Sequence, residues 1–250
     1  MPLQDHFHPP LSARRHWHAF HNAWATYISS DLNQRLPPGY FAESNVQFNI
    51  EIDVAAFEES GGSPPAADKD QSWAPPAPVR TIPFTIATDV VEVLVFSQEG
   101  GPTLAGAVEL VSPANKDRPA HPNAFVSKCE AYLQQGVGLV IVDVVTERET
   151  NLHNELLARL SGAAAPFLDA LLYATAYRPA GRNGQTNLEI WEETLAVGRA
   201  LPTLPLWLRG GLRLPVELET TYQRTCKEQR VTSNGAPVAA DKSPKEDQSP

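Results

Sequence analysis

The chain has 250 residues, of which 42% are hydrophobic, and a net charge of -9 from 20 basic and 29 acidic residues. This length suits one domain with a substantial core. The acidic balance argues against broad contact with phosphate backbones, so any nucleic-acid binding is expected to need a local basic cleft.

The first half of the chain predicts a helix followed by strands. A helix is expected over about 12–36, where aromatic and aliphatic side chains recur at helical spacing before LPPGY. The alternating stretch SNVQFNIEIDVAAFE predicts one strand with one apolar face. The Pro-, Gly- and Asp-rich segment at about 59–79 predicts a disordered insertion inside the domain. Two more strands, near 88–96 and 103–112, are expected to form a hairpin that turns at QEGGP.

The second half has the pattern of strand, helix and strand. HPNAFVSKCEAYLQQG predicts a helix closed by Gly136, and VGLVIVDVV predicts a central strand buried on both faces. Weaker patterns predict a helix near 154–160, strands near 171–177 and 188–193, and a last helix near 215–227. Residues 231–250 are expected to be a disordered tail. The fold class is therefore predicted as α/β (α+β), a single domain over 1–230 with a mixed central β-sheet flanked by helices.

Several site classes find no support in the sequence. Cys129 and Cys226 lie far apart and outside any C-x-x-C pair, which argues against a disulfide framework or a structural zinc site. No export signal or membrane-spanning stretch is recognised, and a cytoplasmic protein is expected. The G-x-G of QQGVGLVIVDVV precedes its strand, whereas a dinucleotide fingerprint follows one. Ser112 lacks a G-x-S-x-G context and is interpreted as a turn or capping residue.

Five histidines fall within the first 21 residues, namely His6, His8, His16, His18 and His21. Helix positions two apart do not share a face, so His16 and His18 cannot easily ligate one ion. The favoured interpretation is a helix surface and packing against Trp17 and Trp24.

The acidic residues suggest a different chemistry. Glu109 lies in an apolar strand, where a lone carboxylate is costly unless it is paired, protonated or bound to a metal. Asp53 lies on the polar face of an earlier strand, and Lys128 flanks the apolar face of the helix that follows Glu109. Two such carboxylates could hold Mg²⁺ or Mn²⁺ while an ammonium polarises a phosphate. The alternatives are a solvated strand face for Asp53 and a structural Glu109–Lys128 ion pair.

The same residues carry a family resemblance. AVELVSPANKDRP and FVSKCEAYLQQGVGLVIVDVV resemble domain-of-unknown-function family 4058 and, more loosely, the Uma-type restriction endonuclease-like proteins. The resemblance spans most of residues 17–226 and is specific over 108–143. It implies a fold like that of the PD-(D/E)XK nucleases, with EIDVAAFE as the P-D strand although isoleucine replaces the proline.

By this resemblance, Asp53 and Glu109 match the two acidic positions, and Lys128 matches a lysine moved onto the helix, since Val111 stands at the usual lysine position. Glu43 and Lys116 are secondary candidates. The resemblance implies a metal-dependent nuclease, a hydrolase of phosphodiester bonds. The alternative is a catalytically inactive scaffold of this fold that binds a protein partner.

Overall fold

The computed structural model describes residues 1–48, 50–58, 73–84, 103–117, 120–161, 167–182 and 185–231. The helices are α1 (Trp17–Asn33), α2 (Pro113–Lys116), α3 (Ala120–Gln134), α4 (Leu152–Ser161) and α5 (Leu218–Glu228). The strands are β1 (Tyr40–Phe48), β2 (Ile50–Glu58), β3 (Arg80–Pro83), β4 (Thr103–Leu110), β5 (Gly138–Asp143), β6 (Tyr173–Arg182), β7 (Gln185–Thr194), β8 (Thr203–Trp207) and β9 (Arg213–Glu217). This mixed α/β architecture confirms the predicted fold class.

The main sheet has seven strands within the described residues, in the order β1-β2-β4-β5-β6-β7-β3. Among the described strands, only β4 and β5 pair in parallel, and α3 lies between them in sequence as a crossover helix. The predicted strand, helix and strand unit is thereby confirmed. Every residue of β5 is buried, which explains its nearly continuous apolar sequence.

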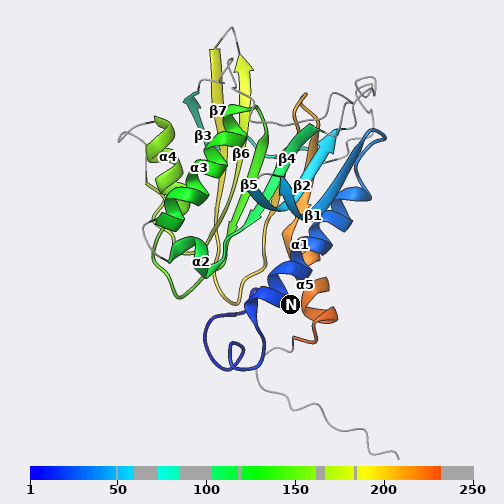
Figure 1. The fold of residues 1–250 in the computed structure, drawn as a ribbon, viewed down its shortest axis with the longest axis vertical. Coiled ribbons are helices and arrows are strands. Elements are labelled where there is room, and N and C mark those ends of the chain that lie inside the picture. The colour runs from blue at the N-terminus through cyan, green and yellow to red at the C-terminus, as the bar shows by residue number, and fades with distance from the viewer. Residues whose placement is uncertain are drawn as a thin grey trace, which may run out of the picture.

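Helices and a hairpin cover the two faces of this sheet. Figure 1 shows α3 and α4 in front of the sheet, while the β8–β9 hairpin and α5, in orange, lie behind it with α1 alongside. The buried side chains divide accordingly into one cluster under α3 and α4 and a second under α1, α5 and the hairpin. Because side chains alternate along a strand, β4 sends Ala107 to the α3 side and Val108 to the α1 side.

The predicted single strand in SNVQFNIEIDVAAFE is wrong. The structure has two antiparallel strands there, β1 and β2, and Phe48 pairs with Ile50 across the reversal. The alternation of apolar and polar residues continues through both strands, so the pattern alone gives no sign of the turn between them. The first helix begins at Trp17 and ends at Asn33, inside the predicted range.

Besides the β1–β2 reversal, four elements were not predicted: the short helix α2, the short edge strand β3 and the two strands of the β8–β9 hairpin. The hairpin crosses the sheet so closely that a Cβ atom at Gly138 would overlap the Trp207 carbonyl oxygen. The predicted strand near 88–96, most of the predicted insertion and the tail after 231 lie outside the described residues. The described end of that insertion contacts the sheet, since Trp191 Nε1 donates a hydrogen bond to Pro76 O. No described helix is long and apolar enough to cross a membrane.

Candidate active site

Asp53, Glu109 and Lys128, the three main residues predicted from sequence, line one pocket of about 330 Å³. They reach it from β2, β4 and α3, respectively. Its remaining wall comes from the first turns of α1 and from the segment around α2. The structure therefore brings together three side chains that are spread over residues 53–128 of the chain.

The register of the sheet places the two carboxylates beside each other. Val54 of β2 pairs with Val108 of β4, so Asp53 and Glu109 occupy the next position of this antiparallel pair. Both side chains therefore leave the same face of the sheet, the face that α3 covers. Their proximity follows from backbone pairing and does not depend on a flexible loop.

Glu109 is buried, with 1% of its surface exposed. Lys128 Nζ donates a hydrogen bond to Glu109 Oε2 at 2.7 Å. The other oxygen, Oε1, is buried and has no hydrogen-bond partner in the described part of the chain. The predicted approach of Lys128 from the flank of α3 is thus observed, with Phe125 and Cys129 buried on the same helix. The Lys128 ammonium also lies 5.2 Å from the centre of the Phe125 ring.

Asp53 is held from two sides. Its Oδ2 atom accepts a hydrogen bond of 2.6 Å from the Leu110 backbone N–H group. Its Oδ1 atom lies 3.2 Å from His21 Nε2, and the same nitrogen lies 3.0 Å from Leu110 O. The imidazole N–H group of His21 therefore faces two acceptors at the edge of the pocket.

His21 is the site residue that sequence reasoning missed. It was interpreted as part of a helix surface that packs against Trp17 and Trp24. It does lie on that face of α1, four residues after Trp17 and three before Trp24, and this is the face that reaches the sheet. A polar ring on the sheet-facing side of a helix, opposite a strand with an aspartate, is the signal that could have identified it.

The charges in the pocket shift one another's pKa values. Burial raises the pKa of Glu109 to about 8; the Lys128 ammonium opposes this rise and the Asp53 charge adds to it. Burial lowers the pKa of His21, but its hydrogen bond to Asp53 and the charge of that residue outweigh burial and raise it to about 9. Burial therefore favours the protonated form of Glu109 more than water does, and a further positive charge in the pocket would favour the ionised form.

The two secondary candidates lie elsewhere. Glu43 is exposed on the edge strand β1 and does not line the pocket. Lys116 is buried on α2, where its ammonium lies 2.8 Å from Asp143 Oδ2 and donates a hydrogen bond to Arg148 O. This pair ties α2 to the end of β5 and gives Lys116 a structural environment away from Asp53 and Glu109.

Comparison with protein-family models, curated proteins and solved structures gives no match. The resemblance to family 4058 and to PD-(D/E)XK nucleases therefore stays a prediction.

The pocket offers carboxylate oxygens to a divalent metal ion, but its described side chains do not form a complete set of metal ligands. No group of three or more His, Cys, Asp or Glu within the described residues is arranged to hold a metal ion. Mg²⁺ is commonly bound by one or two carboxylates and keeps several waters, which two carboxylates such as Asp53 and Glu109 match in kind and number. Both Asp53 oxygens and Glu109 Oε2 already contact other groups of the protein. The unpartnered Glu109 Oε1 atom is an oxygen that such an ion would use.

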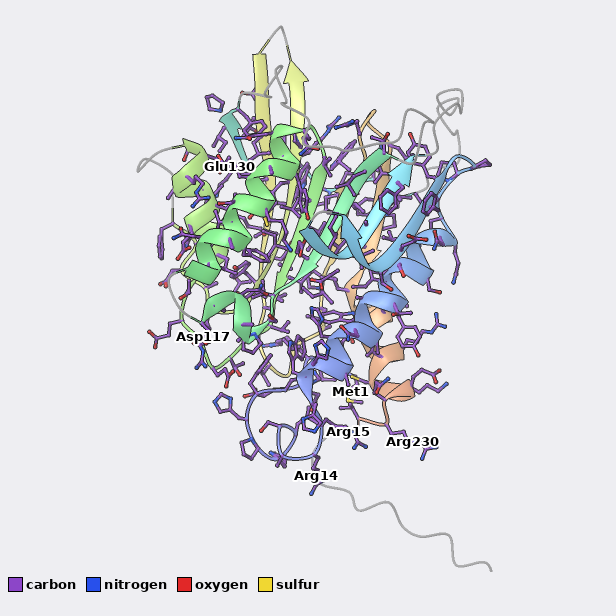
Figure 2. The ribbon with its side chains drawn as sticks, viewed as in Figure 1. Met1, Arg14, Arg15, Asp117, Glu130 and Arg230 are labelled. Carbon is purple, nitrogen blue, oxygen red and sulfur yellow. The ribbon has the colours of Figure 1, made fainter. Side chains whose placement is uncertain are left out.

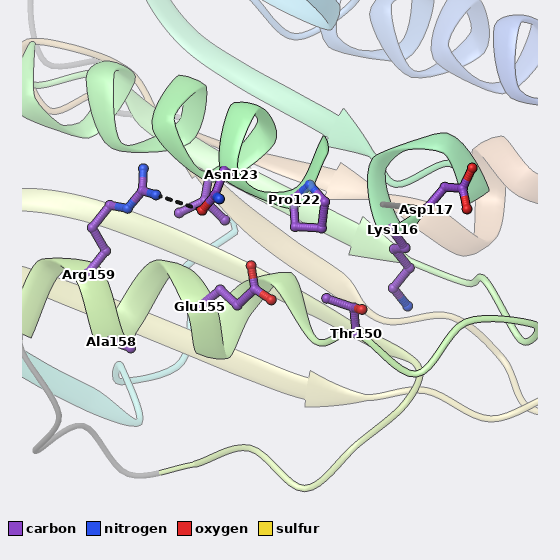
Figure 3. Close-up of a pocket in the computed structure, with 9 residues that line it drawn as sticks. Lys116, Asp117, Pro122, Asn123, Thr150, Glu155, Ala158 and Arg159 are labelled. Atoms are coloured by element: carbon purple, nitrogen blue, oxygen red, sulfur yellow. Dashed lines mark hydrogen bonds between the residues drawn. The ribbon is translucent and has the colours of Figure 1, made fainter. Parts of the chain in front are cut away.

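A second, larger cleft of about 580 Å³ lies on the other side of α3, between that helix and α4. Figure 3 shows Glu155 and Arg159 along one wall and Asn123, bonded to Arg159, opposite. Acidic and basic groups both line it, and Arg159 is also near Glu130, at 3.6 Å. These mutual contacts favour a structural role in joining the two helices.

Proposed function

We propose that this protein is a metal-dependent hydrolase of phosphodiester bonds in which Asp53 and Glu109 bind Mg²⁺ or Mn²⁺. The observation that carries the proposal is the Glu109 Oε1 atom, buried without a hydrogen-bond partner among the described residues, in a pocket shared with Asp53 and Lys128. Leaving such a group unsatisfied costs about 1–3 kcal/mol. A cation between the two carboxylates would remove this cost and would favour the ionised form of Glu109.

Each residue has a separate role in this proposal. A bound divalent ion supplies a water of lowered pKa and neutralises charge on a phosphate. Asp53 and Glu109 hold and orient that ion from two paired strands. Lys128 fixes the Glu109 carboxylate through Oε2 and places a positive charge where a phosphoryl oxygen gains negative charge. His21 holds Asp53 and lies beside Leu110 O, a further oxygen at the edge of the pocket.

A catalytically inactive scaffold that binds a protein partner is the competing hypothesis. It is favoured by the lack of three arranged metal-ligating side chains in the described chain and by the existing contacts of both carboxylates with cationic groups. Under that hypothesis, Glu109 and Lys128 form a structural pair. The two hypotheses predict opposite responses to metal.

Thermal and urea unfolding with and without Mn²⁺ distinguish the metal-dependent hydrolase from the inactive scaffold. Binding to the native state at about 100 times the Kd should stabilise the wild type by about 3 kcal/mol. Asp53→Asn and Glu109→Gln should abolish this gain, whereas Glu43→Gln, which removes an exposed carboxylate outside the pocket, should retain it. A wild type that does not respond to Mn²⁺ or Mg²⁺, or an equal loss in Glu43→Gln, would refute the metal site. Cleavage of labelled oligonucleotides by the same variants then tests hydrolysis.

A further inference from the structure

Tyr132 on α3 has a buried and unpaired hydroxyl group. The residue is 5% exposed, and its hydroxyl oxygen is buried without a hydrogen-bond partner in the described part of the chain. Two other buried tyrosines do have partners. Tyr222 Oη accepts a hydrogen bond from the Gln4 N–H group at 2.9 Å, and Tyr173 Oη accepts one from the His153 N–H group at 3.2 Å. Because an unpaired buried hydroxyl is costly, the one on Tyr132 calls for a partner.

The position of Tyr132 on α3 directs its side chain towards Glu109. Residues four apart on a helix share a face, so Tyr132 lies on the face that carries Lys128. Long helical side chains lean back over the preceding turn, which here is the turn of Lys128. Because Lys128 Nζ donates to Glu109 Oε2 at 2.7 Å, the Tyr132 ring leans towards the same carboxylate. Glu130, two residues earlier, lies on another face of α3 (Figure 2), where it is near Arg159 of α4 at 3.6 Å.

The charges that act on Tyr132 agree with this direction. Burial raises the pKa of Tyr132, and the charge of Glu109 raises it further. Cys129 and Asp53 act in the same direction, each less strongly than Glu109. Glu109 is therefore the charged group that acts most strongly on the hydroxyl. The hydroxyl also keeps its proton and remains a hydrogen-bond donor.

The Tyr132 hydroxyl and Glu109 Oε1 are complementary, since the first is a donor and the second an acceptor. Both atoms are buried, and no hydrogen bond joins them. Tyr132 is not among the described residues that line the pocket, so a ligand in the pocket reaches its hydroxyl only through another molecule. Buried groups that are too far apart for a direct hydrogen bond are commonly bridged by water. Mg²⁺ bound by one or two carboxylates keeps several waters, so the bridging water can be a ligand of the ion.

We propose that Tyr132 is a positioning residue of the Asp53–Glu109 site and that its hydroxyl group holds a water ligand of the divalent ion against Glu109 Oε1. This inference rests on the proposed function for the presence of the ion. In it, Tyr132 contacts neither the ion nor a substrate, and it acts through the water and the carboxylate. Groups that hold the ligands of a metal ion in this way commonly change its affinity about 10- to 100-fold.

Isothermal titration calorimetry with Mn²⁺ tests this role on Tyr132→Phe, which removes only the hydroxyl oxygen. The Kd for Mn²⁺ should rise about 10- to 100-fold. In EDTA, the variant should unfold at the temperature of the wild type or at a higher one, because it lacks a buried group that had no partner. A hydroxyl with a purely structural role would instead lower the unfolding temperature when removed and leave the Kd unchanged.

Tyr222→Phe is the matched control. Its hydroxyl is buried on α5, accepts a hydrogen bond from the Gln4 N–H group and lies 2.7 Å from His6 Nε2. Tyr222 does not line the pocket. Tyr222→Phe should lower the unfolding temperature in EDTA and bind Mn²⁺ with the wild-type Kd. The same pattern in Tyr132→Phe would overturn the proposal.

Asp53→Asn, measured in the same titration, distinguishes failure of this inference from failure of the proposed function. If the wild type binds Mn²⁺, Asp53→Asn does not, and Tyr132→Phe keeps the wild-type Kd, the metal site stands and the role of Tyr132 is refuted. If the wild type binds no Mn²⁺, or Asp53→Asn binds it as tightly as the wild type, the proposed function fails and the role of Tyr132 fails with it. A raised Kd in Tyr132→Phe beside an unchanged Kd in Tyr222→Phe supports the positioning role.

Discussion

Replacing His21 with glutamine should reduce the pH dependence of stability of the metal-free protein. The pKa of His21 is raised from 6.5 to about 9 by its contact with Asp53, although burial opposes the rise. Between these values the folded state keeps a proton that the unfolded chain releases. The stability contributed by this group is therefore complete below pH 6.5 and declines as the pH rises towards 9. The shift corresponds to roughly 3 kcal/mol at its full extent.

Urea unfolding in EDTA at the two ends of this range measures the effect. His21→Gln can still donate a hydrogen bond to Asp53 but cannot carry the charge, so it should lose roughly 3 kcal/mol less than the wild type over the same pH change. His16→Gln, an exposed histidine just before α1, is the control and should follow the wild type. The raised pKa of Glu109 makes its contribution to stability fall in the same direction in all three proteins. Because the His21 charge lowers the pKa of Glu109, the difference between His21→Gln and the wild type reports on the charge of His21 together with its effect on Glu109. Identical losses in His21→Gln and the wild type would refute the charged His21–Asp53 pair.

Three further predictions follow from other contacts. Under the proposed function, Lys128→Met should lower metal-dependent cleavage about 100-fold, because the ammonium acts on the phosphate. Mn²⁺ should still stabilise this variant, because the carboxylates hold the ion. A cleavage assay and thermal unfolding measure the two effects. Gly138→Ala should lower the free energy of unfolding in urea by roughly 1–3 kcal/mol or more, because its Cβ atom would overlap the Trp207 backbone. Gly181→Ala, where the Cβ atom would meet open space, should be nearly neutral. His6→Gln should weaken the gain of stability between pH 4 and 6.5, since burial lowers the pKa of His6 to about 4 and the unfolded chain binds the extra proton there.

Glu109 could be predicted from the sequence because it interrupts an apolar strand, where a lone carboxylate needs a partner. Asp53 on a polar strand face and Lys128 at the flank of an apolar helix face are ordinary positions, and they were chosen as groups that could act with Glu109 and by the family resemblance. His21 was missed because a histidine next to tryptophans is ordinary on a half-buried helix. The role of His21 depends on which strand packs against that face of the helix, and this tertiary contact cannot be seen in the local sequence.

The difference between local sequence patterns and tertiary contacts also explains the errors in the predicted fold. The crossover from β4 to β5 was predicted because periodicity changes from strand to helix and back within 103–145. The β1–β2 reversal was missed because both strands share one alternating pattern. The β8–β9 hairpin was missed because each strand has only five residues. Its position is specified by close approach at Gly138, which a linear pattern cannot show.

If the proposed metal site exists, Glu109 would change its protonation state on metal binding while the backbone stays the same. In the absence of a metal ion, burial raises the pKa of Glu109 to about 8 against the opposing charge of Lys128, which favours the protonated carboxyl over a buried negative charge. A divalent cation would supply the missing positive charge and would make the ionised form the favoured one, with release of a proton. The β2–β4 register holds Asp53 and Glu109 together in either state, so the change requires protons and an ion and no rearrangement of the sheet. The structural pair with Lys128 uses only Oε2 of Glu109, whereas the metal-binding hypothesis also gives a partner to Oε1, which has none among the described residues.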